Sequence, residues 1–155
     1  MRRFEIAKGW ENKGIKLPKR KTKFAAGYDL CAAEDIVVPP YSADIDQKPT
    51  LVPTGLKAIM NDDDMMLIIS RGSTPIKHGL VLPNSMAVID ADYYENPDND
   101  GHFYIQVLNI RSKPYMVKKG TAIAQAVFVK YLITDNDDAA GKRLGGFGST
   151  DKARN

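Results

Sequence analysis

Apolar residues along the chain occur in short runs that alternate with polar, turn-forming segments. The runs have the length and composition of β-strands, and they cover Ile36–Val38, Leu56–Met60, Met65–Ile69, Leu80–Leu82, Met86–Ile89, Phe103–Ile110 and Ile123–Ile133. Proline, asparagine, aspartate and glycine fill the intervals between them. One short helix is predicted at Pro75–Gly79. The pattern favours an all-β fold, a jelly-roll or antiparallel β-barrel, over alternating strands and helices.

The segment from Ala139 to Asn155 has no strand periodicity and contains the run Gly145-Gly146-Phe147-Gly148. An aromatic residue between glycines suggests a backbone that folds around a flat ligand. We therefore expect a β-barrel domain at 1–138 and a flexible C-terminal arm at 139–155.

Length, apolar runs and cysteine content exclude several classes of protein. A chain of 155 residues fits one domain, and we find no apolar run long enough to span a membrane and no secretory signal. The single cysteine, Cys31, excludes an internal disulfide and a Cys-rich zinc site, so a cytoplasmic location is expected.

The net charge of +3 permits an anionic ligand. The basic cluster at Lys16–Lys23 is interpreted as a solvated loop, and no nucleic-acid partner is expected because aromatic residues are not interleaved with it.

Several kinds of site are excluded by their missing motifs. The chain has no P-loop sequence, no HExxH zinc motif and no nucleophile elbow. The acidic runs at 98–101 and 135–138 lack the later glutamate of a calcium loop and are interpreted as turns.

Three features could carry chemistry. Asp90 ends an apolar run, where partial burial suits a general base. Tyr93 offers a flat ring for a sugar or base. Arg71, within the sequence Ser70-Arg71-Gly72-Ser73-Thr74, lies beside a small, hydroxyl-rich turn that could bind phosphate.

Together with other segments, these residues resemble the homotrimeric dUTPase family. The matching motifs occur in order over nearly the whole chain: AAGYDLCAA from Ala25, SRGST from Ser70, PNSMAVIDADY from Pro83, KGTAIAQAVF from Lys119 and RLGGFGST from Arg143. The resemblance implies a jelly-roll homotrimer in which each active site takes motifs from all three chains. It also implies hydrolysis of dUTP to dUMP and pyrophosphate by attack of water on the α-phosphorus, with Mg²⁺ on the triphosphate. Such an enzyme lowers dUTP and supplies dUMP for thymidylate synthesis.

The resemblance assigns the nucleoside contacts to the third motif and the hairpin that follows it. Asp90 resembles the general base, and Tyr93 resembles the ring that packs on deoxyribose and excludes a 2′-hydroxyl. The residues that resemble the uracil contacts are Asn84, the backbone of Val88 and Ile89, and Tyr104.

The phosphate contacts come from the other motifs. They correspond to Arg71, Gly72, Ser73 and Gln125, and Asp29 resembles the carboxylate that orients magnesium-bound water. The resemblance also implies that the arm at 139–155 closes over the site as a lid, in which Phe147 corresponds to a residue that stacks on uracil. The γ-phosphate would be clamped by Ser149, Thr150 and a basic residue, either Arg143, which we favour, or Lys142.

The sequence also departs from the family pattern. Gly72 replaces the usual serine, Ala87 and Glu95 replace usual glycines, and a polar stretch is inserted at Asn96–Gly101. One alternative is a dCTP deaminase or bifunctional relative, but the region from Phe103 to Gly120 lacks the glutamate that deamination needs. The other is a regulatory protein that uses this scaffold as a nucleotide-gated binding surface.

Overall fold

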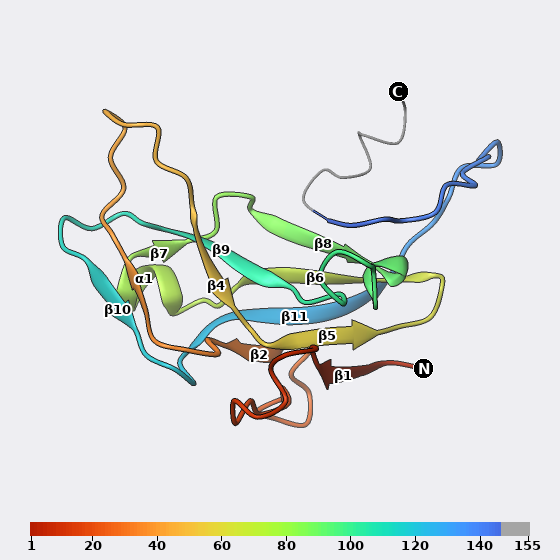
Figure 1. Cartoon of the computed structure of the whole chain (residues 1–155), viewed down its shortest axis with the longest axis horizontal. Coiled ribbons are helices and arrows are strands. Elements are labelled where there is room, and N and C mark those ends of the chain that lie inside the picture. The colour runs from red at the N-terminus through yellow and green to blue at the C-terminus, as the bar shows by residue number, and fades with distance from the viewer. Residues whose placement is uncertain (147–155) are drawn as a thin grey trace.

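The computed structural model describes residues 1–146, and these form an antiparallel β structure with one short α-helix (Figure 1). The strands are β1 (Arg3–Ile6), β2 (Tyr28–Cys31), β3 (Ile36–Val38), β4 (Thr50–Pro53), β5 (Leu56–Ile59), β6 (Asp64–Ser70), β7 (Leu80–Val81), β8 (Met86–Asp90), β9 (Tyr104–Asn109), β10 (Tyr115–Val117) and β11 (Ala122–Lys130). Helix α1 covers Thr74–His78, and a 3₁₀ turn, η1, covers Ala91–Tyr93.

The largest sheet has the strand order β2–β11–β6–β8. Strand β6 pairs with β11 on one side, ending at the pair Asp64 and Lys130, and with β8 on the other. Residue Met65 lies opposite Asp90, and Ile69 lies opposite Met86. Strand β8 is therefore the edge strand, and its outer backbone groups point away from β6.

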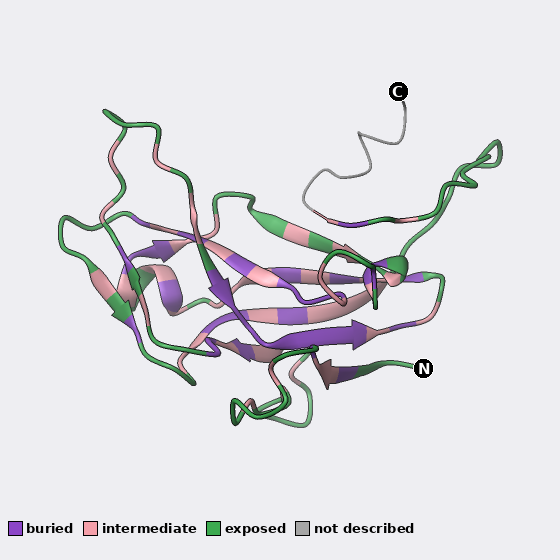
Figure 2. Cartoon of the chain, in the orientation of Figure 1, coloured by how far each residue is buried: buried purple, intermediate pink, exposed green. Residues whose placement is uncertain are grey.

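The core lies between this sheet and the smaller ones, β4–β9–β7, β1–β5 and β3–β10. Burial alternates along β9, where Ile105 and Val107 are buried while Tyr104 and Gln106 are only partly covered (Figure 2). This two-residue period places one face of β9 in the core and leaves the other only partly covered.

Most of the predicted elements are present with ends shifted by one or two residues. The helix prediction is confirmed, and the helix stops because Gly79 adopts a left-handed φ of 65° and its N–H bonds to Pro75 O. No described helix has the length and apolar content needed to cross a membrane.

The strand predicted at Ile123–Ile133 is wrong at its C-terminal end, because β11 stops at Lys130. Beyond Lys130 the partner strand β6 has no further residues to pair with. Leu132 and Ile133 are consequently 97% and 69% exposed.

Candidate active site

A cavity of about 310 Å³ lies between the edge strand β8 and the start of β9. Residues from the two strands, the connecting segments and the C-terminal segment line it: Asn84, Met86, Ala87, Val88, Ile89, Asp90, Tyr93, Phe103, Tyr104, Gln106, Arg143 and Gly146. The structure thus brings seven of the sequence-predicted site residues into one hollow.

Local geometry at β8 explains this gathering. Ser85 has a φ of 59° in the turn before the strand, and Ser85 N donates to Leu82 O. The turn places Asn84 at one end of the cavity, and the alternating exposure of β8 continues through Met86 and Val88 to Asp90 at the other. Because β8 is an edge strand, the backbone of Val88 and Ile89 supplies donors and acceptors along the cavity wall.

Two tyrosines form the walls at the Asp90 end. Tyr93 is 7% exposed, and burial raises the pKa of its hydroxyl. The ring of Tyr104 lies 4.2 Å from that of His102, centroid to centroid. The walls are therefore held by packing as well as by the backbone.

Arg143 closes one side of the cavity. Its guanidinium pairs with Asp90 Oδ2 and, at 2.6 Å, with Asp92 Oδ1, and lies 5.8 Å from the centre of the Tyr93 ring. At Gly146 an added Cβ would lie 2.7 Å from Tyr93 Cε2, so glycine permits this close approach. The first part of the predicted arm thus lies against its own chain, and Asp92 is a site residue that the sequence motifs did not indicate.

A second group of predicted residues gathers where β2, β6 and β11 meet. Arg71 Nε donates to Asp29 Oδ1 at 2.9 Å, and Arg71 Nη1 donates to Ala122 O at 3.0 Å. Gln125 lies opposite Asp29 in the strand register, and its Nε2 donates to Ser70 O at 3.1 Å. The guanidinium is therefore aimed by a carboxylate and a carbonyl together.

The turn after Arg71 leaves two positions available for an anion, Ser73 and Gly72. Ser73 precedes α1, and its hydroxyl makes no capping bond to the helix. Gly72 is exposed, and an added Cβ would meet nothing within 4 Å, so this position has room for the serine that the family usually carries.

Among the residues gathered around Arg71, only Asp29 has an oxygen that suits contact with a metal-bound water. Its Oδ2 is buried without a hydrogen-bond partner among residues 1–146, with Lys21 Nζ 3.7 Å away. Within the same residues, no cluster of three or more His, Cys, Asp or Glu side chains is placed to hold an ion. These donors fit Mg²⁺ carried by a phosphate ligand and contacted through water, and they do not fit a direct protein cage.

The two groups lie apart in one chain. Asp90 is opposite Met65 at one end of β6, whereas Arg71 follows Ser70 at the other end. Five residue steps along a strand span roughly 17 Å. Figure 1 likewise shows α1, beside Arg71, at the opposite end of the sheet from the end of β8. Phe147, Ser149 and Thr150 lie outside the described residues.

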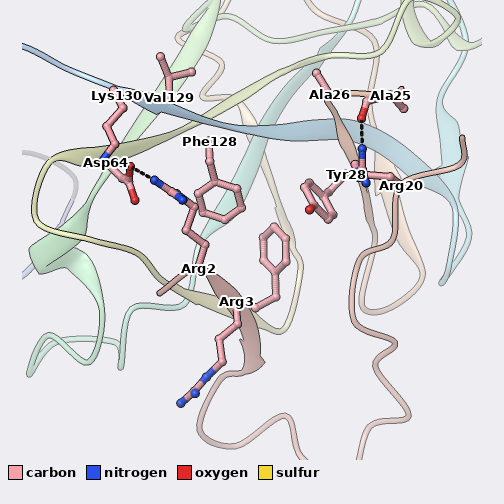
Figure 3. Close-up of a pocket in the computed structure, with 11 residues that line it drawn as sticks. Arg2, Arg3, Arg20, Ala25, Ala26, Tyr28, Asp64, Phe128, Val129 and Lys130 are labelled. Carbon is pink, nitrogen blue, oxygen red and sulfur yellow. Dashed lines mark hydrogen bonds and ion pairs between the residues drawn. The ribbon is translucent and has the colours of Figure 1, made fainter. Parts of the chain in front are cut away.

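A second hollow, of about 390 Å³, lies beside β1 (Figure 3). Its cations already have partners: Arg2 pairs with Asp64 at 2.7 Å, Arg3 with Glu5 at 2.6 Å, Lys130 with Asp63 and Asp64, and Arg20 donates to the carbonyls of Lys23 and Ala25. Each of the cations lining this hollow is therefore neutralised by a carboxylate or bonded to a carbonyl within residues 1–146.

Known proteins match this chain over nearly its whole length. A family model for dUTPase matches residues 13–150. The chain is 43% identical over 152 residues to the deoxyuridine 5'-triphosphate nucleotidohydrolase of Lactococcus lactis, with 97% of each chain covered. It is 33% identical over 159 residues to the Desulfitobacterium hafniense protein of the same name, with 94% of each covered.

Solved structures give the same result. The dUTPase of Streptococcus mutans superposes with a TM-score of 0.79 at 39% identity, covering 86% of this chain and 99% of that one. A dUTPase variant from phage phi11 of S. aureus, whose structure shows the coordination of a structural Mg(II) ion, shares the fold at 19% identity and a TM-score of 0.68, covering 91% of this chain and 97% of that one.

Proposed function

This chain belongs to the dUTPase family and is a dUTP diphosphatase, and from that premise we propose which of its residues hydrolyse dUTP to dUMP. The observation that carries the proposal is the cavity at β8, where a carboxylate, a backbone edge and two tyrosines converge. These are the groups needed to hold a pyrimidine nucleoside and to activate water beside it.

In the proposed reaction Asp90 accepts a proton from a water molecule as that water attacks the α-phosphorus. The bond from the α-phosphorus to the oxygen bridging to the β-phosphate breaks, and pyrophosphate leaves with that oxygen. The Asp90 side chain is 52% exposed, so water can reach it. Arg143 must release Asp90 when substrate binds, and its guanidinium is then free to contact the triphosphate.

Uracil would be recognised by Asn84 and by the backbone of Val88 and Ile89 opposite Tyr104. Fixed backbone donors and acceptors reject cytosine because the wrong base leaves buried polar groups unpaired. Among residues 1–146, the cavity lining contains a single carboxylate, that of Asp90. A dCTP deaminase would need a further acid near the pyrimidine amino group, so the cavity favours dUTP hydrolysis over deamination.

Arg71, Gly72, Ser73 and Gln125 would bind the phosphates. Mg²⁺ bound to the triphosphate would neutralise part of its charge, and Asp29 Oδ2 would hold the ion through an intervening water. The residue that clamps the γ-phosphate is Arg143 or Lys142, together with Ser149 and Thr150.

We infer that the protein works as a homotrimer with shared sites. The roughly 17 Å along β6 from Met65, opposite Asp90, to Ser70, just before Arg71, exceeds the separation of the α- and γ-phosphates in one nucleotide. A second copy of the chain must therefore bring its Arg71 group to the Asp90 cavity of the first, as closed symmetric assemblies allow.

The test is release of pyrophosphate from dUTP, UTP, dTTP and dCTP with Mg²⁺, by the wild type and by Asp90→Asn. We expect dUTP to be the preferred substrate. Asp90→Asn should lower kcat by about 10³-fold with KM changed little, because a general base acts mainly in the transition state. The matched control, Asp92→Asn, removes the neighbouring partner of Arg143 and should retain most turnover. Equal losses in the two variants would contradict the role of Asp90, and release of ammonia from dCTP would contradict the substrate.

A further inference from the structure

The loop from Asn96 to Gly101 departs from the family pattern and has no part in the reaction proposed above. It joins η1 to the segment before β9, so it connects Tyr93 to Tyr104, the two walls of the cavity. Asp100 and Gly101 have left-handed φ values of 61° and 79°. A backbone held in such a conformation without glycine at Asp100 needs compensating contacts, and the loop supplies them.

The amide of Asn96 forms every hydrogen bond it can form. Its Oδ1 accepts from the backbone N–H groups of Asp98 and Asn99, at 3.1 and 3.2 Å. Its Nδ2 donates to Tyr93 O and to Asn99 Oδ1, both at 2.8 Å. An amide has two donor and two acceptor positions, so Asn96, which is 5% exposed, is fully satisfied.

The amide of Asn99 is also fully used. Its Oδ1 accepts from Asn96 Nδ2 and from Gly101 N at 3.1 Å. Its Nδ2 donates to Tyr93 Oη at 2.8 Å and to His102 O at 3.2 Å. Tyr93 Oη in turn donates to His102 O at 3.2 Å. Tyr93 is thus held by Asn96 at its backbone carbonyl, and by Asn99 and the carbonyl of His102 at its hydroxyl.

The loop is anchored to the barrel. Lys57 of β5, whose side chain is 9% exposed, pairs with Glu95 and Asp100, each at 3.0 Å. Lys8 N donates to Asp100 Oδ2 at 2.7 Å. Asn99 is therefore presented by a fixed support, and its bond to Tyr93 restrains the ring relative to β8.

We propose that Asn99 is a positioning residue that sets the preference for deoxyribose over ribose by holding the ring of Tyr93 against the sugar. This inference rests on the proposed contact between Tyr93 and the sugar. Excluding a 2′-hydroxyl means denying space to one oxygen atom, so a small rotation of the ring is enough to admit it. The two hydrogen bonds at Tyr93 Oη, from Asn99 and to His102 O, oppose a swing of the ring about its Cα–Cβ bond, and loss of Asn99 leaves only the longer of the two.

The experiment compares kcat/KM for dUTP with kcat/KM for UTP in the wild type, Asn99→Ala, Tyr93→Phe and the double variant. Asp98→Asn is the matched control, because Asp98 is exposed in the same loop and its side chain forms no bond to Tyr93. We expect Asn99→Ala to lower the dUTP:UTP ratio by about five- to tenfold, the size of one hydrogen bond, mainly through faster turnover of UTP. Tyr93→Phe removes the bond from Asn99 and also the bond to His102 O, so the double variant should match Tyr93→Phe.

Each outcome decides a separate point. An unchanged ratio in Asn99→Ala, or a lower ratio in the double variant than in Tyr93→Phe, overturns the positioning role while leaving dUTP hydrolysis intact. A drop in Asp98→Asn as large as in Asn99→Ala shows a general effect of the loop and also overturns it. Loss of thermal stability alone, without a change in the ratio, counts against it as well. Failure of the wild type to hydrolyse dUTP would instead overturn the proposed function. If Asn99→Ala does not fold, Tyr93→Phe still tests the bond.

Discussion

His102 should make the stability of the protein depend on pH well above the range in which carboxylates titrate. The residue is 4% exposed, and its Nε2 accepts a hydrogen bond from Gly55 N at 2.9 Å. Its ring packs on Tyr104 and on Trp10, whose centroids lie 4.2 and 5.1 Å away. Burial lowers the pKa of His102 from 6.5 to about 4, so the folded chain favours the neutral ring.

The size of the effect follows from this shift. A depressed histidine pKa means that the unfolded chain takes up the proton first, so stability is constant above pH 6.5 and falls as the pH drops towards 4. The complete shift from 6.5 to about 4 corresponds to about 3 kcal/mol. Between pH 7 and pH 5 the loss should be about 2 kcal/mol. The pKa of Asp64, held at about 2 mainly by its bond to Arg2, contributes only in more acidic solution.

The assay is denaturant unfolding at pH 7, 6 and 5, at fixed protein concentration and ionic strength, for the wild type and His102→Gln. Glutamine can still accept the bond from Gly55 N but does not titrate. The variant will be less stable at pH 7 because it loses ring packing, so only the change with pH is compared. The wild type should lose about 2 kcal/mol more than the variant between pH 7 and pH 5. Equal losses in the two proteins would refute the argument.

Two further predictions concern the site. Arg143→Ala should raise KM for dUTP about tenfold, because a charged hydrogen-bonding partner of the triphosphate is lost, whereas Lys142→Ala should change it far less; steady-state kinetics will show the reverse order if Lys142 is the clamp. Co-refolding equal amounts of Asp90→Asn and Arg71→Ala chains should restore activity in roughly a quarter of the sites, because some sites then take an intact residue from each chain. If both residues act from the same chain, the mixture should be as inactive as either variant alone.

The sequence predicted the segments whose pattern is strong over several residues. Strands β6, β8 and β9 carry apolar runs, and the helix at Thr74–His78 is preceded by serine and ended by glycine. Strands β1, β2, β4 and β10 were not predicted, because in these strands of three or four residues apolar residues are interrupted by charged, polar or proline residues or flanked by prolines and lysines. Strands of that length are stabilised by their partners, and the partners are distant in sequence. The same reasoning explains why the strand predicted to Ile133 ended early.

The site was predictable in part for a similar reason. Asp90 and Tyr93 lie within one motif, so their proximity follows from the local sequence. The ion pair from Arg143 to Asp92 and the bond from Asn99 to Tyr93 depend on where the chain returns in space. No spacing rule indicates such contacts, and asparagine in a turn-rich segment is ordinarily explained by the turn itself.

The open edge of β8 has a consequence for the behaviour of the protein in concentrated solution. Met86 and Val88 are 50% and 52% exposed on a strand whose outer backbone groups have no neighbouring strand in the described sheets. An edge with unpaired backbone hydrogen-bonding groups, the feature that we propose reads the nucleobase, is also a template on which a foreign strand can add and aggregation can begin. The same edge of β8 therefore serves the proposed site and exposes the protein to aggregation. A substrate, or the segment around Arg143, that covers this edge should also reduce aggregation.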